Sequence, residues 1–212
     1  MSTYTLYYMP GSASFVVHWL LVEIGAPTEL RLVDGAAGEQ KRPDYLKLNP
    51  SGVVPTLLVD GEPVCEAAAI ALLLADRHPE ARLAPASGTR ARAVYLQWMM
   101  HLANTLQPAF RHWFYPAEAA GSEHEAAAKT CARGRIEAVF QRLDDHLSAH
   151  GPYLCGEAPT AADFHACMLV RWARNMPRPA TDWPAIADFA RRMKGRSSFH
   201  AVCAREGLTE WL

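Results

Sequence analysis

The chain has 212 residues, of which 50% are hydrophobic and 20% charged, and its formal net charge at pH 7 is −1. This length allows one large domain or two small ones, and the composition is typical of a folded globular chain rather than a disordered one. A charge so close to zero gives no electrostatic reason to expect a nucleic acid or an anionic membrane as partner. No apolar run approaches the ~20 residues of a membrane span.

The cysteines and the N-terminus bear on the compartment and on metal binding. The 5 cysteines are widely spaced and none forms Cys-x-x-Cys, and the 9 histidines include no His-Glu-x-x-His motif. We therefore expect no metal site. The first residues lack the basic stretch and apolar core of a signal peptide. Together these features favour a cytoplasmic protein with reduced thiols.

The first eighty residues alternate between strand and helix signals. Residues 4–9 are aromatic and β-favouring and predict a strand that ends at Pro10-Gly11. The apolar residues that follow have helical spacing and predict a helix from Ser14, its N-cap candidate, to Ile24. Residues 30–33 predict a second strand, and residues 43–48 predict a short helical turn.

A tight turn marks the next pair of strands. Asp60-Gly61, a preferred hairpin dipeptide, separates the strand-like runs 56–59 and 62–65. An alanine-rich helix is then predicted from Glu66 to His78. The order strand, helix, strand, turn, hairpin and helix predicts a mixed four-stranded sheet with one right-handed crossover.

The rest of the chain has helical patterns only. Residues 80–88 are expected to form a linker between an α/β domain, 1–79, and an all-α domain, 89–212. Within the second domain the sequence predicts a helical pattern that continues past Pro108. It also predicts long helices over 123–149 and 161–175, and shorter ones from Trp183 and near Ser197. Thr160 to Asp163 fits a capping box, to which we assign no chemistry.

Three hydroxyl groups lie near the start of the first predicted helix. Ser12 and Ser14 stand between the strand and the helix, and Tyr8 stands at the end of the strand. Ser14 has an ordinary structural interpretation as an N-cap, and Tyr8 has one as a core aromatic residue. A hydroxyl at a helix N-terminus is also suited to stabilising a ligand thiolate, so all three are candidate catalytic residues.

Two further positions also allow two interpretations. Glu66, at the start of the third helix, is a favourable partner for the helix dipole, worth ~0.3–1 kcal/mol. Alternatively, it pairs with a ligand ammonium while the amides of that helix bind an anionic group. Pro55 opens a predicted strand, where an ordinary trans proline is tolerated, and only ~5–6% of X–Pro bonds are cis.

Taken together, the motifs resemble those of the cytosolic glutathione S-transferases over nearly the whole chain. The resemblance is carried by residues 46–57, by Asp60-Gly61, by residues 66–70 and by residues 156–163. It implies a thioredoxin-like N-terminal domain, an all-helical C-terminal domain and a homodimer. It further implies glutathione as co-substrate and a role in detoxification.

The resemblance also implies roles for individual residues. Pro55 would be cis and would turn the Val54 backbone toward the cysteinyl part of glutathione. Glu66 and Ala67 would hold the γ-glutamyl end. The glycine carboxylate would be held by Gln40 and Lys41.

Two positions depart from the family pattern. Ala67 stands where a serine is usual, and loss of that hydroxyl is expected to weaken binding by ~0.5–1.5 kcal/mol. Ala13 stands where bacterial members with a Pro-Gly-x-Cys motif have a catalytic cysteine. Pro10-Gly11-Ser12 instead resembles the start of the serine-type transferases.

We therefore expect Ser12 to donate a hydrogen bond to a glutathione thiolate, with Ser14 and Tyr8 as alternative donors. The thiolate would attack a small apolar electrophile, expected against the helical domain near His101, Asn104, Trp113 and Phe114. Two other functions remain open. One is glutathione-dependent reduction of disulfides or peroxides, and the other is non-catalytic binding of glutathione or apolar ligands.

Overall fold

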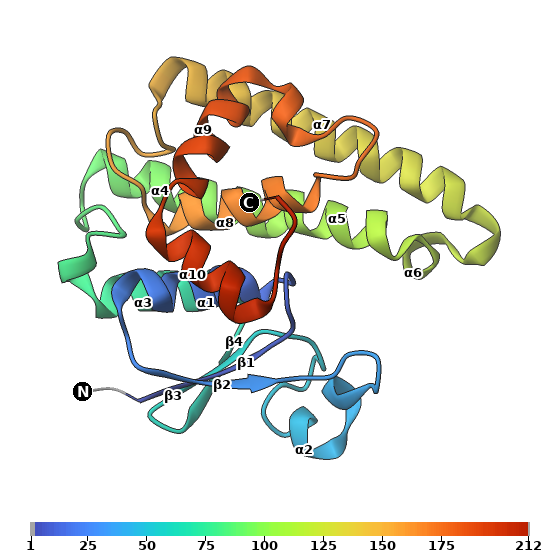
Figure 1. Ribbon diagram of the computed structural model, residues 1–212. Coiled ribbons are helices and arrows are strands. Elements are labelled where there is room, and N and C mark those ends of the chain that lie inside the picture. Colours follow the sequence, from blue (N-terminus) through green and yellow to red (C-terminus); the bar gives the residue numbers. More distant parts are fainter. Residues whose placement is uncertain (1–2, 212) are drawn as a thin grey trace. The chain divides into compact units, whose positions relative to one another are not determined.

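The computed structural model describes residues 3–211. They form two compact units (Figure 1). The first unit comprises the chain up to Ala84 together with the segment from Lys194 onward, and the second comprises Pro85–Met193. No helix of the described residues is both long and apolar enough to cross a membrane.

The first unit contains the predicted mixed four-stranded sheet. Its order is β2-β1-β3-β4, with β1 and β2 parallel and the other pairs antiparallel. The elements are β1 (Tyr4–Tyr8), α1 (Ser14–Ile24), β2 (Thr28–Leu32), α2 (Pro43–Leu46), β3 (Thr56–Val59), β4 (Glu62–Cys65), α3 (Ala67–Arg77) and α10 (Ser197–Glu206). The α/β fold expected from the sequence is thus confirmed, although β2 begins two residues earlier than its sequence pattern indicates.

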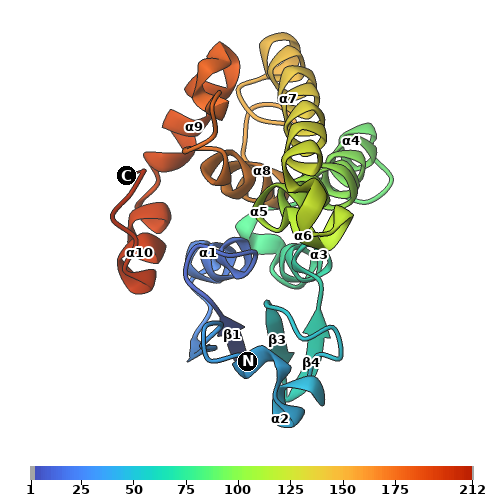
Figure 2. The same cartoon turned by 90° about the vertical axis from the view of Figure 1, so that its right-hand side faces the viewer.

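Helix α1 is buried nearly all round. Figures 1 and 2 show α1 and α3 side by side on one side of the sheet, and α10 packs against α1. The Trp19 indole Nε1 donates to Ser198 Oγ at 2.9 Å, and the Phe199 ring lies 5.1 Å from the Trp19 ring. Residues 194–211, which the sequence pattern groups with the helical domain, therefore belong to the same compact unit as the sheet.

The second unit is helical. Its helices are α4 (Arg90–His101), α5 (Gln107–Phe114), α6 (Pro116–Ala120), α7 (Glu125–His150), α8 (Ala161–Trp172) and α9 (Pro184–Lys194). Helix α8 lies among the others (Figure 2), and its residues 161–171 are all buried. Between α4 and α5 the chain forms a π-helical turn, Leu102–Leu106, just before Pro108. A proline lacks the N–H of the regular α-helical ladder, which explains a local change of pitch at this point.

The capping box predicted before α8 is present. The Thr160 backbone N–H and hydroxyl both donate to Asp163 Oδ2, at 2.7 and 2.9 Å. Asp163 Oδ1 accepts the Leu154 N–H at 2.8 Å, so the carboxylate also fixes the loop before the helix. This group is structural, as the sequence pattern indicates.

Candidate functional site

Strand register gathers the candidate residues at one end of the sheet. Tyr7 pairs with Thr56, and Thr56 pairs with Cys65. The residues just beyond these pairs, Tyr8, Pro55 and Glu66, therefore emerge at the same end. The loop after β2 starts there as well, because Tyr8 pairs with Leu32, the last residue of β2. Four separate segments of the chain thus meet at one edge of the first unit.

The hydroxyls of Ser12 and Ser14 form a small network in the loop between β1 and α1. Ser12 Oγ lies 2.8 Å from the Met9 carbonyl oxygen and 2.9 Å from Ser14 Oγ. Ser14 Oγ accepts the Met9 N–H at 3.2 Å and also lies 3.1 Å from the Met9 carbonyl. Ser12 is half-buried and Ser14 is fully buried. Ser12 is therefore the more accessible of the two hydroxyls.

The expectation that Ser14 is the N-cap of α1 is wrong. Ala13 occupies the cap position in helical conformation, and no side chain caps the helix. Because Ser14 is the first residue of the helix and not its cap, its hydroxyl turns back to Met9. Tyr8, at the end of β1, is half-buried, with its ring 5.7 Å from the ring of His18.

A buried carboxylate that the sequence pattern does not indicate anchors this loop. Glu206 Oε2, at the end of α10, accepts the Gly11 N–H at 2.8 Å, and Oε1 lies 2.8 Å from His18 Nδ1. Both side chains are almost completely buried. Glu206 follows Gly11 by 195 residues, so no local pattern in the sequence indicates the contact.

The Val54–Pro55 peptide bond is cis, as the family resemblance implied and the residues alone did not. Two side chains hold the preceding backbone. The Tyr45 hydroxyl and Asn49 Nδ2 both donate to the Val53 carbonyl oxygen, at 2.7 and 2.8 Å. Asn49, only 2% exposed, also lies within hydrogen-bond distance of the Thr56 hydroxyl. This loop is therefore placed by buried hydrogen bonds.

Gln40 and Lys41 lie against the same loop, in a 3-10 turn over Glu39–Lys41. Lys41 Nζ donates to the Ser51 carbonyl oxygen at 3.3 Å. A Cβ atom on Gly52 would come within 2.9 Å of the Gln40 carbonyl oxygen and of Lys41 Nζ, and the φ angle of Gly52 is +60°. Glycine is thus required for this close approach. Gln40 Oε1 is buried without a hydrogen-bond partner among the described residues.

Glu66 precedes α3 in an unusual backbone conformation. Its φ angle is +71°, rare for a non-glycine residue, and its side chain is exposed. Ala67, the first residue of α3, is buried. The first amides of a helix lack intrahelical acceptors. The N-terminus of α3 therefore offers N–H donors next to Glu66. Burial raises the pKa of the neighbouring Cys65 thiol.

The residues expected to face the second substrate belong to the second unit. Phe114 is 47% exposed and stacks on Phe110, with 5.9 Å between the ring centroids. Trp113 is half-buried, with Lys129 Nζ 5.6 Å from its ring centroid. Asn104 is exposed on the π-helical turn. His101 is half-buried, and burial lowers its pKa.

Within the described residues, no three His, Cys, Asp or Glu side chains are grouped so as to hold a metal ion. The candidate site in the first unit instead offers backbone N–H and C=O groups at one edge of the sheet. Its side chains add the Glu66 carboxylate, the Lys41 ammonium and the hydroxyls of Ser12 and Ser14. Such a set suits a short peptide ligand that carries charges of both signs. These groups are supplied mainly by loops on a rigid sheet, as is common for binding sites.

Comparison with known proteins identifies the class. Residues 2–76 match the N-terminal domain of glutathione S-transferases, and residues 97–196 match the C-terminal domain. The chain therefore belongs to the glutathione S-transferase family.

Individual members are similar over almost the full length. A glutathione S-transferase from Xanthomonas campestris is 32% identical over 206 residues, which cover 96% of this chain and 98% of that protein. The crystal structure of a glutathione transferase homologue from Sulfitobacter, with bound glutathione, has a TM-score of 0.89 and 29% identity, and covers 97% of this chain and 99% of that one. A sphingomonad glutathione S-transferase complexed with glutathione has a TM-score of 0.84 and 31% identity, with 97% and 100% covered.

Proposed function

We propose that this protein, a glutathione transferase by family, activates the thiol of glutathione with the Ser12 hydroxyl and conjugates it to a small apolar electrophile. The observation that carries the proposal is the meeting of four segments at one sheet edge. The four segments hold Ser12, Val54-Pro55, Gln40-Lys41 and Glu66-Ala67. Strand register brings the ends of β1, β3 and β4 together. The Gln40-Lys41 segment follows β2 and is held by the hydrogen bond from Lys41 to Ser51.

Each chemical group of glutathione has a suitable partner in this set. The γ-glutamyl ammonium would pair with the Glu66 carboxylate, and the γ-glutamyl carboxylate with the free amides at the start of α3. The Val54 backbone would pair with the cysteinyl N–H and C=O. Lys41 would pair with the glycine carboxylate, and a ligand N–H would satisfy the unpartnered Gln40 Oε1.

The thiolate is the reactive form, and a free thiol has a pKa of ~8.5. A sulfur placed beside Ser12 would receive a hydrogen bond and would lie near the N-terminus of α1, which favours negative charge. Ser14 would then donate to the Met9 carbonyl and hold the loop, since the two hydroxyls share that acceptor. Ser12 is therefore the proposed catalytic hydroxyl, Ser14 a positioning residue, and Tyr8 the alternative donor.

The reaction is a nucleophilic substitution or addition. The thiol loses its proton to solvent, the sulfur forms a bond to the electrophilic carbon, and a leaving group such as chloride departs from an aryl halide. The electrophile would pack against aromatic side chains of the helical unit, of which Phe114 is the most exposed candidate. Binding both reactants in one orientation adds to the activation of the sulfur.

The cysteines favour conjugation over a reductase mechanism that uses a protein thiol. The loop from Met9 to Ser14 has no cysteine. Cys65, next to Glu66, has a raised pKa because of burial and stays protonated at neutral pH, which makes it a poor nucleophile. None of the five cysteines, all of which lie among the described residues, is in a disulfide. We propose a cytoplasmic location, where thiols stay reduced.

The decisive experiment is the pH profile of the Ser12→Ala variant with 1-chloro-2,4-dinitrobenzene. We expect the apparent pKa of the bound thiol to rise by about one unit, and the rate below that pKa to fall about tenfold. The pKa is checked independently from the ultraviolet absorbance of the bound thiolate. Ser87→Ala, an exposed serine in the linker, is the matched control.

Other outcomes would reassign the roles. An unchanged profile in Ser12→Ala with a shifted profile in Tyr8→Phe would transfer the role to the tyrosine. Faster turnover on a small disulfide than on the aryl halide would identify a reductase. Tight glutathione binding with no turnover on either substrate would identify a binding protein.

The family likeness also leads us to propose a homodimer. Leu96 and Met100, 38% and 42% exposed, stand one turn apart on α4 and give that helix an apolar outer face. Analytical ultracentrifugation should give twice the mass of one chain. A monomer mass at micromolar concentration contradicts this part of the proposal.

A further inference from the structure

The π-helical turn between α4 and α5, Leu102–Leu106, sets the rotation of the helix that follows it. The Gln107 backbone N–H donates to the Leu102 carbonyl oxygen, five residues back, where a regular α-helix bonds four residues back. Each residue turns an α-helix by ~100°, so one extra residue in this turn rotates the side chains of α5 by about that angle. The turn therefore decides which side chains of α5 are exposed.

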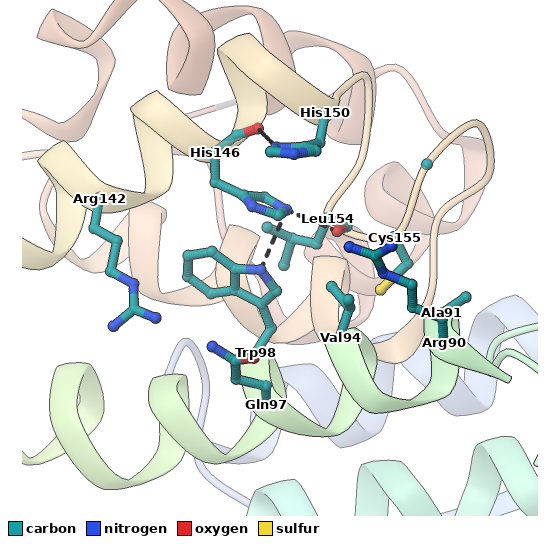
Figure 3. Close-up of a pocket in the computed structure, with 11 residues that line it drawn as sticks. Arg90, Ala91, Val94, Gln97, Trp98, Arg142, His146, His150, Leu154 and Cys155 are labelled. Atoms are coloured by element: carbon teal, nitrogen blue, oxygen red, sulfur yellow. Dashed lines mark hydrogen bonds between the residues drawn. The ribbon is translucent and has the colours of Figure 1, made fainter. Parts of the chain in front are cut away.

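Helix α4 is held in place before the turn. Trp98 Nε1 lies 3.2 Å from His146 Nε2 of α7, and that nitrogen also lies 2.9 Å from the Leu154 carbonyl oxygen (Figure 3). Tyr95 and Met99 of the same helix are completely buried. Because α4 is fixed by these contacts, a change in the turn would rotate α5 and not α4.

The last residue of α5 is the aromatic side chain to which the proposed function assigns the electrophile. Phe114 is 47% exposed, and its ring lies 6.1 Å from that of Trp172 at the end of α8. Phe110, one turn earlier, is completely buried and contacts both rings. Phe114 is thus the outer ring of this cluster, and its direction follows from the rotation of α5.

Pro108 disturbs the helix but does not select how the chain responds. In a regular α-helix its ring would clash with the Asn104 carbonyl group, and it has no N–H to donate. A helix relieves such a clash either by a kink or by a widened turn. Another contact is needed to select the widened turn.

His165 of α8 supplies this contact. Its Nε2 lies 2.8 Å from Gln107 Oε1, and because an amide oxygen only accepts, Nε2 carries the hydrogen and donates. Gln107 is therefore held twice, through its backbone by Leu102 and through its side chain by His165. Both bonds act on the residue that closes the π-helical turn.

The His165 side chain carries a cost that stability does not explain. It is completely buried, and its Nδ1 has no hydrogen-bond partner among residues 3–211. A buried polar atom without a partner destabilises the folded state. An apolar side chain would fill the same place without this loss. The histidine is better explained by the bond that its Nε2 makes.

We propose that Gln107 and His165 are positioning residues for the electrophile. Their hydrogen bond keeps the π-helical turn in the register that exposes Phe114, and so gives the protein a preference for aromatic over aliphatic electrophiles. This role rests on the proposed function, in which Phe114 packs against the electrophile. Both residues act through the rotation of α5 and not on the reacting atoms.

The test is calorimetric titration of the full-length protein with two glutathione conjugates. S-(2,4-dinitrophenyl)glutathione carries an aryl group and S-methylglutathione does not, so the ratio of their affinities measures the contribution of the aryl group alone. We expect the wild type to prefer the aryl conjugate. Gln107→Ala and His165→Leu should each reduce this preference about three- to tenfold, because the aromatic contact is lost. The affinity for S-methylglutathione should stay unchanged.

Matched variants separate positioning from general damage. Gln97→Ala, which removes an exposed glutamine of α4, should leave the affinity ratio unchanged. Gln107→Glu keeps an oxygen that accepts from His165 and should retain the preference. His165→Leu should not lower the free energy of unfolding, since it removes a buried atom without a partner, whereas a purely structural histidine would give a less stable variant. In a crystal structure of Gln107→Ala, the Phe114 ring should no longer lie against Trp172.

Two results would overturn the proposal while leaving the proposed function intact. One is an unchanged affinity ratio in both Gln107→Ala and His165→Leu. The other is an equal fall of the ratio in Gln97→Ala. If the wild type binds neither conjugate, the proposed function itself fails, and the positioning role fails with it.

Discussion

At the scale of single residues, the sequence identifies chemical groups but not their environments. The sequence offers Ser12 as the expected donor, with Ser14 and Tyr8 as alternatives, but it does not show that Ser14 is fully buried and Ser12 half-buried. That difference depends on where the helix begins. Ala13 adopts helical angles and moves Ser14 inside the helix, and a shift of one residue lies below the accuracy of any local pattern.

Ala67→Ser tests the assignment of the γ-glutamyl end directly. Ala67 is buried at the first position of α3, beside Glu66. A hydroxyl added there would donate to the ligand carboxylate, and we expect glutathione to bind about three- to tenfold more tightly. Calorimetry with glutathione measures the change. Ala69→Ser, which adds the same group at an exposed position of the same helical turn, is the control. Equal effects of both substitutions would remove Ala67 from the site.

Asn49 is expected to act through the backbone that it holds. Asn49→Ala removes the donor to the Val53 carbonyl oxygen and the acceptor of the Ser51 N–H. The free energy of unfolding should fall by ~1–3 kcal/mol, and KM for glutathione should rise more than kcat falls. Urea denaturation and steady-state kinetics measure these effects. The exposed Asn175→Ala serves as control, and a fall in kcat with unchanged KM would contradict the positioning role.

At the scale of elements, the sequence succeeds where the signal is local. The Asp60-Gly61 turn and the capping box before α8 each act within a few residues, and both are found as predicted. The π-helical turn before Pro108 is not predicted, since the proline pattern shows a disturbance but not how the helix absorbs it. Element type thus follows from short-range chemistry, and exact geometry does not.

Helix α8 gives a prediction of pH dependence because burial shifts the pKa of its Asp163 and of its His165. Burial lowers the pKa of His165 to about 4, from an ordinary ~6.5. Between these values the unfolded chain binds a proton that the folded chain does not. The stabilising effect of neutral His165 is therefore complete above pH ~6.5 and is lost as the pH falls toward 4. Asp163, whose pKa burial raises to about 6, acts with the opposite sign between pH ~4 and 6.

A difference measurement separates the two groups. We compare the free energy of unfolding of the wild type with that of His165→Gln, by urea denaturation between pH 4.5 and 7.5. Relative to the variant, the wild type should lose about 1.4 kcal/mol per pH unit below pH ~6.5, because Asp163 contributes equally to both. His124→Gln, at an exposed histidine, should give a curve parallel to the wild type. If the curve for His165→Gln runs parallel to that of the wild type, the buried ring does not cause the loss of stability at low pH.

At the scale of the whole molecule, the organisation depends on contacts between distant parts of the sequence. The compact unit that contains the sheet also includes α10, through Trp19 with Ser198 and through Gly11 and His18 with Glu206. These pairs are separated by 179 to 195 residues, so hydrophobic periodicity does not connect them. The division into an α/β domain, 1–79, and an all-α domain, 89–212, stays a prediction from the sequence.

The Glu206 contacts predict that the C-terminal helix controls the loop that holds Ser12. Glu206→Ala leaves the Gly11 N–H and His18 Nδ1 without their acceptor in a buried place, and each such loss is worth ~1–3 kcal/mol. We expect the free energy of unfolding to fall by about 2–4 kcal/mol. Hydrogen exchange should increase at Gly11 and in the first turn of α1, while α7 and α8 in the second unit stay protected.

The same variant distinguishes a local effect on the site from general destabilisation. If the loop loses its anchor, the apparent pKa of bound glutathione should rise toward the free value at temperatures where the protein is still fully folded. Arg205→Ala, at an exposed position of α10 one residue before Glu206, is the control. A stability loss in Glu206→Ala with an unchanged thiol pKa would mean that α10 supports the fold of the first unit without governing the Ser12 loop. In that case the residues that match the N-terminal domain of the family, 2–76, would form the sulfur site without help from α10.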